Sequence, residues 1–275
     1  MKQFILLILL IIGFHTFAQE MNVITYNIRY NNPGDGENAW PMRKDLVGQL
    51  LRFHEADIFG LQEAMIGQIE DLCKALPEFK WVGVGRIDGK QAGEFSPVFY
   101  NSKKFNLLDN GNFWLAEDCT KPALAWDAAC ERVCSWAILE EKQSGKKILV
   151  LNTHLDHVGK IAREKSAELT LRKIEEINTE ELPVILTGDF NTFPDTKPIE
   201  IFKTKLSDSK EISEQAPYGP EGTFNSFNFN YPLDKRIDYI FVNKKVKVKK
   251  YAVLSDSKNL HYPSDHLPVF VTIVL

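Results

Sequence analysis

The sequence predicts an α/β fold in which two packed sheets are flanked by helices. Apolar strand-like segments recur along the chain, mostly without helices between them, and only three or four segments have helical apolar spacing. This order favours layered sheets over a doubly wound parallel sheet, in which strands and helices alternate. The turn after the first expected strand, at 26–29, contains no glycine, which argues against a dinucleotide-binding fold.

Each expected element follows from the period of its apolar residues. Residues 22–28 alternate as a strand, and residues 40–56 have helical spacing. Residues 57–61 form a short apolar strand, and a second helix covers 66–76. The other expected elements are strands at 79–83, 95–100, 105–112, 132–139 and 147–152, a helix at 159–178, a buried strand at 183–187, and strands at 236–243, 246–254 and 267–274. The basic run at 244–250 is expected to be an exposed edge strand.

The first 18 residues have the features of a cleavable signal peptide. Lys2 supplies a short positive region, residues 4–14 are apolar, and Thr16 to Ala18 offer a cleavage site after Ala18. The alternative is an uncleaved anchor, but the apolar run is shorter than the span of about 20 residues that a bilayer requires. We therefore expect a signal peptide at 1–18 and one domain at 19–275, secreted or periplasmic and without stable membrane insertion.

The chain is acidic, and this limits the classes of partner. Its formal charge is −4 and its pI about 5.9; loss of Lys2 with the signal peptide changes −4 to −5. Tight binding to long nucleic acid needs basic surface, so the composition disfavours that class, although a local basic patch is compatible with a negative total.

The four cysteines lack the paired spacing of zinc ligands. Export permits disulfides, and the sequence leaves open whether Cys119 and Cys130 are bridged. Cys134 lies in an expected strand and is predicted to be a buried thiol.

Polar clusters occur in six segments, each within or at the end of an apolar strand. Hydrolysis of a phosphate ester requires charge neutralisation on the phosphate oxygens, an activated water and a stabilised leaving oxygen. Mg²⁺ suits this chemistry and takes oxygen ligands. Singly, each cluster has a structural explanation, such as a turn at Asn27 or a helix cap at Glu63. Together they predict a hydrolytic site, with these residues: Asn27, Glu63, His154, Asp189, Asn191, Asp238, Asp265 and His266.

In this order the segments resemble the endonuclease/exonuclease/phosphatase superfamily, above all in Gly188-Asp189-Phe190-Asn191 and Ser264-Asp265-His266. The resemblance covers nearly all of the chain after residue 20. It implies a DNase I-like, four-layer α/β/β/α sandwich, in which two mainly antiparallel or mixed sheets pack together between helices. It also implies a metal-dependent phosphoric ester hydrolase.

The resemblance assigns the metal ligands. Glu63 resembles the principal Mg²⁺ ligand, with Asn27 beside it, and Asp265 resembles a residue that also reaches the metal. Mn²⁺ is expected to be a possible substitute.

The resemblance also assigns the catalytic residues. Asp189 is similar to the residue that orients or deprotonates the attacking water, and Asn191 to the amide that holds the phosphate or nucleophile. His154 and His266 resemble the pair that contacts the phosphate oxygens. Asp238 is similar to the partner that fixes the His266 tautomer and favours its imidazolium.

Further likenesses at 82–86, 93–100, 113–116 and 126–129 are to an uncharacterised exported bacterial branch, for which the resemblance supplies no substrate. The presence of His154 disfavours the exonuclease III type of DNA-repair enzyme. For Trp126 core packing is an equal alternative to substrate contact, and Arg163 could equally be a solvated helix residue. The residues expected at the substrate rim are Arg86, Glu94, Tyr100, Trp126, Asp127 and Arg163.

The sequence therefore predicts an exported, Mg²⁺-dependent, monomeric phosphoesterase. Its substrate, a phosphodiester or a phosphomonoester, is left open among nucleic acid, phospholipid and sugar or inositol phosphates. The alternative is a catalytically inactive module that binds phosphorylated ligands, but such a module has no need of the complete residue set.

Overall fold

A computed structural model describes residues 20–275 as two six-stranded sheets packed face to face. The expected signal peptide at 1–18 lies outside the described residues. The first sheet has the order β11-β12-β1-β2-β4-β3. Its strands are β1 (Glu20–Asn27), β2 (Ile58–Gln62), β3 (Phe79–Val82), β4 (Val98–Asn101), β11 (Lys247–Val253) and β12 (Val269–Val274). Only β1 and β2 are parallel among the pairs described in this sheet.

The second sheet has the order β5-β6-β7-β8-β10-β9, and here β7 and β8 form the parallel pair. Its strands are β5 (Phe105–Trp114), β6 (Val133–Glu141), β7 (Lys147–His154), β8 (Val184–Asp189), β9 (Ser207–Asp208) and β10 (Asp238–Val242). Each sheet thus has a parallel pair at its centre with antiparallel strands on both sides.

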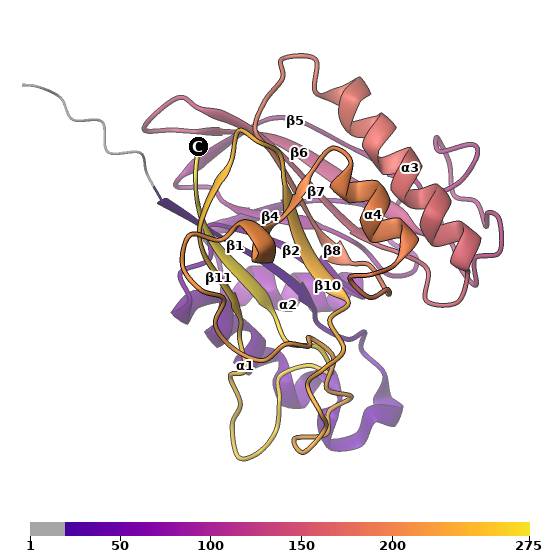
Figure 1. Ribbon diagram of the computed structural model, residues 1–275. Coiled ribbons are helices and arrows are strands. Elements are labelled where there is room, and N and C mark those ends of the chain that lie inside the picture. Colours follow the sequence, from indigo (N-terminus) through magenta and orange to yellow (C-terminus); the bar gives the residue numbers. More distant parts are fainter. Residues whose placement is uncertain (1–19) are drawn as a thin grey trace, which may run out of the picture.

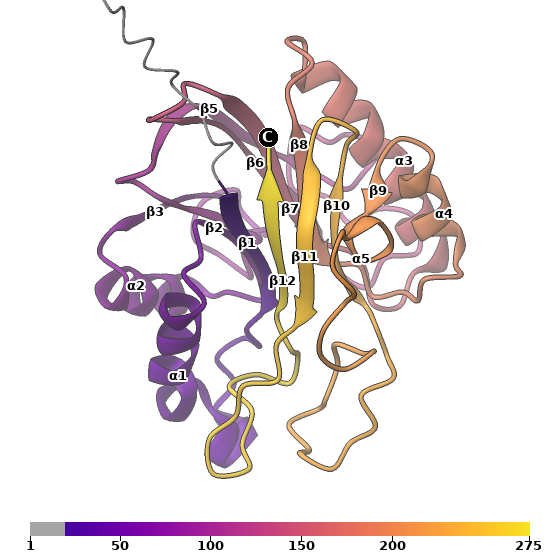
Figure 2. The ribbon, with the colours of Figure 1, turned by 60° about the vertical axis from the view of Figure 1, so that its left-hand side comes forward.

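Helices cover the outer faces of both sheets (Figures 1 and 2). The helices α1 (Trp40–Phe53) and α2 (Ile66–Ala75) pack on the first sheet, and α3 (Lys160–Ile177) and α4 (Lys197–Lys203) on the second. Two short helices, η1 (Pro33–Asn38) and α5 (Ser209–Ile212), lie in connections. The four-layer α/β/β/α sandwich expected from the sequence is confirmed.

Three apolar layers hold the sandwich together. Along β1, successive side chains face opposite sides, so Val23 joins the core between the sheets while Ile24 joins the core beneath α1 and α2. A third core fills the space between the second sheet and α3 and α4. Burial on both faces explains why the central strands read as nearly continuous apolar runs.

A buried polar network joins the two sheets beneath the strand ends. Gln62 Nε2 donates to Asn152 Oδ1 at 2.6 Å, and Thr187 Oγ1 donates to the same oxygen at 3.0 Å. Gly60 lies directly beside this network, and a Cβ at that position would collide with Thr187 and Asn152. Glycine is therefore required at this position, where β2 approaches the second sheet closely.

Most expected elements are present with shifted ends. The strand expected at 95–100 begins only at Val98, because Phe95 instead bridges Ala64 and Gly85 outside the sheet. The basic segment at 244–250 does lead into β11, an edge strand whose lysines are partly or fully exposed. The elements that the sequence did not predict are all short: η1, α4, β9 and α5.

Within residues 20–275, all four cysteines are free thiols, and Cys134 is buried as expected. None of the described helices combines the length and apolarity needed to cross a bilayer.

Candidate active site

Polar residues converge on a cleft at one edge of the two sheets. Because β1 and β2 run parallel, Asn27 pairs with Gln62 at their carboxyl ends; because β7 and β8 run parallel, His154 pairs with Asp189. The antiparallel partners β10 and β12 begin at the same edge, which places Asp238 opposite Asp189. Ligands of α/β sheets commonly bind outside the carboxyl ends of strands. The cleft has a volume of about 680 Å³, within the range of small-molecule sites.

One end of the cleft is lined by Glu63, Asp189, Asp265 and His266, with Asn27 and Asp238 buried behind them. These six residues are here called the acidic end. Asn27 joins two of its carboxylates: its Nδ2 donates to Glu63 Oε1 at 3.1 Å and to Asp189 Oδ2 at 3.0 Å. Its Oδ1 accepts the Arg29 backbone N–H at 3.0 Å, which fixes the amide orientation. In this arrangement Asn27 orients carboxylates and turns its nitrogen, not its oxygen, towards them.

Asp238 and His266 form a buried pair that spans the two sheets. His266 Nδ1 lies 2.8 Å from Asp238 Oδ2, and Thr223 Oγ1 donates to the same oxygen at 2.6 Å. Burial alone would lower the pKa of His266, but Asp238 and Asp189 outweigh it and raise this pKa well above the ordinary value. The pair therefore favours an imidazolium with its Nε2–H directed at the cleft.

Asp189 lies at the centre of the acidic end. Its Oδ2 is 3.4 Å from His154 Nε2 and 3.8 Å from His266 Nε2. Burial and the nearby Asp238 raise the pKa of Asp189 to about 7. A carboxylate with such a pKa can accept a proton near neutral pH.

His154 differs from His266 in charge. Asn191 Nδ2 lies 2.9 Å from His154 Nε2 and 3.0 Å from the Leu155 carbonyl, so the amide donates to both acceptors. Burial, together with the positive charges of Arg132 and Arg86, lowers the pKa of His154 well below the ordinary value. The two histidines that the sequence predicted as a pair are thus one neutral and one charged.

The backbone adopts left-handed conformations at the ends of these strands. Glu63 has φ 59° and Asn191 has φ 47°, in a region that costs energy for residues other than glycine. Such conformations persist where the surrounding structure fixes them, commonly at functional sites. Here they turn both side chains into the cleft immediately after β2 and β8.

The acidic end fits a divalent cation. Burial and the nearby Glu63 raise the pKa of Asp265, whose Oδ1 accepts only the Ser264 hydroxyl, at 3.3 Å, among the side-chain hydrogen bonds of the described residues. Glu63 Oε2 accepts the Tyr30 N–H at 3.1 Å, and Arg29 lies 3.8 Å away. The positive charges of Arg29 and His266 also act on these two carboxylates. Their oxygens are the kind of ligand that Mg²⁺ prefers.

A second grouping offers ligand atoms within 4.8 Å of one another, namely Asp189, Asp238 and His266. Its geometry is less suited to a cation, because Asp238 and His266 already share a hydrogen bond and a protonated imidazole has no free lone pair. Glu63 and Asp265 are therefore the better-placed ligands.

Four residues expected at the substrate rim lie elsewhere. Tyr100 is buried in the core between the sheets, opposite Ile58 at the start of β2 and hence far from the strand end that carries Glu63. Asp127 accepts the Ile161 and Ala162 N–H groups and so caps α3. Arg163 donates to the Asp156 carbonyl, and Trp126 packs against two apolar clusters. The prediction that these four residues lie at the substrate rim is therefore wrong. The other two residues expected there, Arg86 and Glu94, do line the cleft.

Several cleft residues were not singled out from the sequence. His157, an exposed residue, lines the cleft together with Arg132 and Cys130. Phe193, 45% exposed, and Phe224 add apolar surface. These residues come from loops without periodic patterning. Among them, His157 and Phe193 follow His154 and Asp189 closely in the sequence, whereas Cys130, Arg132 and Phe224 carry no such signal.

The sequence pattern of the Endonuclease/Exonuclease/phosphatase family matches residues 24–266, which contain every element of the acidic end. The chain belongs to this family. Its members are hydrolases that act on phosphoester bonds, so the enzyme class predicted from the sequence is the class of the family.

Solved structures with the same fold include close relatives of this family member. A family protein from Bacteroides thetaiotaomicron is 39% identical, with a TM-score of 0.90, covering 94% of this chain and 98% of that one. A mannosyl-6-phosphatase from the same species is 40% identical, with a TM-score of 0.90, covering 93% of this chain and 100% of that one.

A more distant relative is the CCR4-Not complex 3'-5'-exoribonuclease subunit Ccr4 of Mycosarcoma maydis. It is 21% identical over 335 residues, which cover 90% of this chain and 49% of that protein. This chain therefore spans about half the length of that relative.

Proposed function

We propose that this protein is an exported, Mg²⁺-dependent phosphatase that hydrolyses phosphomonoesters of small hydroxylated molecules such as sugars. The observation that carries the proposal is the meeting, in one cleft, of the Glu63 and Asp265 carboxylates with the buried Asp238–His266 pair. A cation held by Glu63 and Asp265 would neutralise charge on the phosphate and activate a water.

In the proposed reaction His266 stabilises charge on the phosphoryl group. Its Nδ1 is engaged by Asp238, which leaves Nε2–H free to donate to a phosphate oxygen. A neutral His266 would be a weaker hydrogen-bond donor to the phosphate than an imidazolium. Asp238 therefore acts by keeping His266 protonated.

Asp189 is proposed to take the proton of the attacking water. Its carboxylate is held by Asn27 on one side and by the Asn191 backbone N–H at 2.9 Å on the other, which fixes its direction. Asn191 and the neutral His154 lie beside Asp189 and are proposed to position the phosphate. Each of these contacts orients a group before the substrate arrives.

Three observations favour a small phosphomonoester. The 40% identical relative is a mannosyl-6-phosphatase. The chain is acidic, which opposes the counterion release that strengthens binding to long nucleic acid. The cleft volume of about 680 Å³ suits a small ligand.

The second candidate is a phosphodiesterase acting on nucleic acid, which the Ccr4 relative favours. Exposed Phe193 at the cleft edge would offer a face on which a base stacks. The inactive binding module is disfavoured, because the residues for metal, proton transfer and phosphate are all present.

A substrate panel tests the proposal. Phosphate release is measured from mannose 6-phosphate and p-nitrophenyl phosphate, p-nitrophenol release from bis(p-nitrophenyl) phosphate, and nucleotide release from a single-stranded RNA, each with Mg²⁺, Mn²⁺ or EDTA. We expect metal-dependent turnover that is highest on the monoesters. Higher kcat/KM on the diester and RNA would favour the phosphodiesterase, and binding of phosphorylated ligands without turnover would favour the binding module.

Export is supported by the signal-peptide features of residues 1–18. Expression of the full chain and of a chain lacking 1–18 in a Gram-negative host, followed by cell fractionation, tests it. We expect shortened protein outside the cytoplasm only from the full chain; full-length protein retained in the cytoplasm would contradict export.

A further inference from the structure

The end of the cleft beyond His154 is built differently from the acidic end. It consists of Arg86, Glu94, Cys130, Arg132, Asp156 and His157, here called the neutral wall. All but Asp156 line the cleft. Arg86 Nη1 donates to Glu94 Oε2 at 2.8 Å, and Arg132 pairs with Asp156, with its Nε 3.4 Å from Oδ2.

The charges of the neutral wall cancel. Two guanidinium groups face two carboxylates, and His157 Nδ1 lies 3.0 Å from Arg132 Nη2. Because a guanidinium can only donate, His157 Nδ1 accepts, and the imidazole is neutral in this contact. A surface of this kind offers no net attraction to a second phosphate or to a cation.

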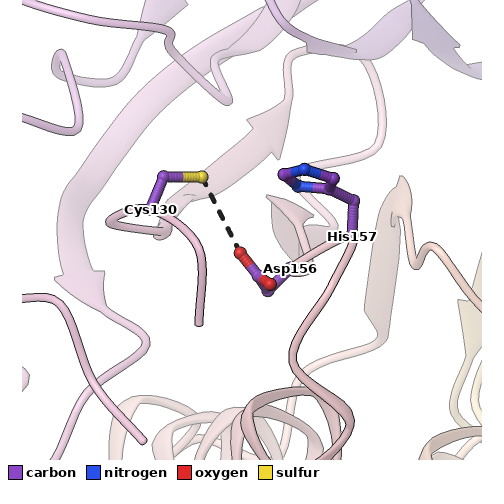
Figure 3. A group of neighbouring side chains, drawn as sticks. All are labelled: Cys130, Asp156 and His157. Atoms are coloured by element: carbon purple, nitrogen blue, oxygen red, sulfur yellow. Dashed lines mark hydrogen bonds between the residues drawn. The ribbon is translucent and has the colours of Figure 1, made fainter. Parts of the chain in front are cut away.

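Three members of the neutral wall nevertheless resemble a metal site. Cys130, Asp156 and His157 bring potential ligand atoms within 4.8 Å, and Figure 3 shows the Cys130 thiol directed at Asp156. Two of these residues already use their lone pairs. Asp156 accepts the Ala129, Val158 and Gly159 N–H groups and Arg132 Nε, and His157 Nδ1 accepts from Arg132 Nη2. The positive guanidinium beside these atoms opposes a cation, so the group is not a second metal centre.

Buried donors without a hydrogen-bond partner lie on residues that line this end of the cleft. Within residues 20–275, Arg86 Nε, Arg132 Nη1 and His154 Nδ1 are buried and have no hydrogen-bond partner. Arg132 itself is only 5% exposed while it lines the cleft. A buried donor without a partner costs about 1–3 kcal/mol, so an acceptor on a ligand would be stabilised where these side chains turn towards it.

Glu94 supplies a hydrogen-bond acceptor beside these donors, because a carboxylate accepts hydrogen bonds. A hydroxyl group both donates and accepts, and adjacent hydroxyls on a ring match a carboxylate beside a guanidinium. The wall is also close to the reacting groups: Glu94 Oε2 lies 4.0 Å from His154 Nδ1, and His154 Nε2 lies 3.4 Å from Asp189.

We propose that the neutral wall is the subsite for the uncharged, hydroxyl-bearing part of the substrate, with Arg86, Glu94 and Arg132 hydrogen-bonded to the hydroxyls of a sugar or polyol. This inference rests on the proposed phosphomonoesterase function. It specifies what the leaving group must carry and which residues select it.

Two substrates with the same phosphoryl group separate recognition from chemistry. Mannose 6-phosphate carries hydroxyls and p-nitrophenyl phosphate carries none. We compare kcat/KM for both in wild type, in Glu94→Gln, and in the Arg86→Gln/Glu94→Gln double variant, which removes both charges together. We expect the ratio of kcat/KM, sugar over aryl phosphate, to fall about ten-fold or more, mainly through a higher KM, because unpaired polar groups in such a site oppose binding.

The matched control is Glu70→Gln, an exposed carboxylate on α2, which should leave the ratio unchanged. An equal loss on both substrates, or no loss on either, would overturn the subsite while leaving the phosphatase function intact. Absence of turnover by wild type on either monoester would overturn both.

A measurement on unaltered protein guards against misfolded variants. Mannitol should inhibit aryl phosphate hydrolysis competitively at high concentration, whereas an equal concentration of a polyether without hydroxyl groups should not. Tighter competition by a hexose bisphosphate than by the hexose monophosphate would contradict an uncharged subsite, because it would require excess positive charge on the wall.

Discussion

The two ends of the cleft use charge in opposite ways. The acidic end gathers four carboxylates, Glu63, Asp189, Asp238 and Asp265, around His266 and Arg29, so negative charge is in excess. The neutral wall instead pairs Arg86 with Glu94 and Arg132 with Asp156. Excess negative charge favours the binding of a cation. Paired charges with unpartnered donors favour the binding of uncharged hydroxyl groups. The contrast teaches that one cleft can separate phosphate chemistry from substrate selection over a few ångströms.

The largest expected effect is at the acidic end. His266→Ala should reduce kcat by about 10²–10⁴-fold, because it removes the donor that Asp238 keeps charged. Phosphate release under saturating Mg²⁺ measures it. His261→Ala, at an exposed histidine, is the matched control; a similar loss in both variants would show that the effect is not specific to the cleft.

Glu63→Gln should weaken metal binding by at least about ten-fold, with turnover partly restored at higher Mg²⁺. The isosteric amide keeps the acceptor for the Tyr30 N–H but removes the negative charge. Titration of activity with Mg²⁺ gives the apparent affinity. An unchanged metal dependence would exclude Glu63 as a ligand and move the cation elsewhere in the cleft.

Gly60→Ala tests the close contact between β2 and the second sheet, beside the polar network that joins the two sheets. The added Cβ would collide with Thr187 and Asn152, so we expect a loss of about 1–3 kcal/mol in the free energy of unfolding. Denaturant unfolding measures it. Gly67→Ala, in α2 with open space around the position, should be neutral or stabilising, and an equal cost at both sites would contradict the close approach of the sheets.

The smallest expected effect concerns the support of the neutral wall. Burial alone would raise the pKa of Asp156, but the Gly159, Val158 and Ala129 N–H groups outweigh it and lower the pKa to about 2, against an ordinary value of 3.8. The ionised group therefore stabilises the fold above about pH 4, and this stabilisation is lost as the pH falls towards 2.

Asp156→Asn should cost about 1 kcal/mol in the free energy of unfolding at pH 7, and the difference from wild type should shrink between pH 4 and pH 2. Urea unfolding across this range measures it, with the exposed Asp195→Asn as control. A difference that is independent of pH would contradict the ionic role of Asp156.

The sequence places the residues of the acidic end within or at the ends of apolar strands, and in the structure they meet at one edge of the sheets. Strand direction brings Asn27, Glu63, His154 and Asp189 to one edge, and a polar group inside an apolar strand marks Asp238. The resemblance at 93–100 suggested Tyr100 for the substrate rim, but β4 runs antiparallel to β2 and its carboxyl end lies at the opposite edge. Strand direction is a tertiary property that the alternation of apolar residues does not encode.

The neutral wall could not be predicted in the same way. Arg132 and His157 precede and follow strands in loops whose path is set by the Asp156 hydrogen bonds, not by periodicity. The left-handed turns at Glu63 and Asn191 also lack a sequence signal, because neither residue is a glycine. Resemblance identified these two residues, but only the folded chain explains how their side chains reach the cleft.

Two hydrogen bonds described above, Asn27 to Asp189 and His266 to Asp238, join one sheet to the other across their interface. Neither sheet, with its own helices, carries a complete set of reacting groups. Turnover therefore reports on the docking of the two halves of the molecule. A compact state that kept its strands and helices but loosened this docking would be catalytically silent while its circular dichroism spectrum in the far ultraviolet remained nearly native.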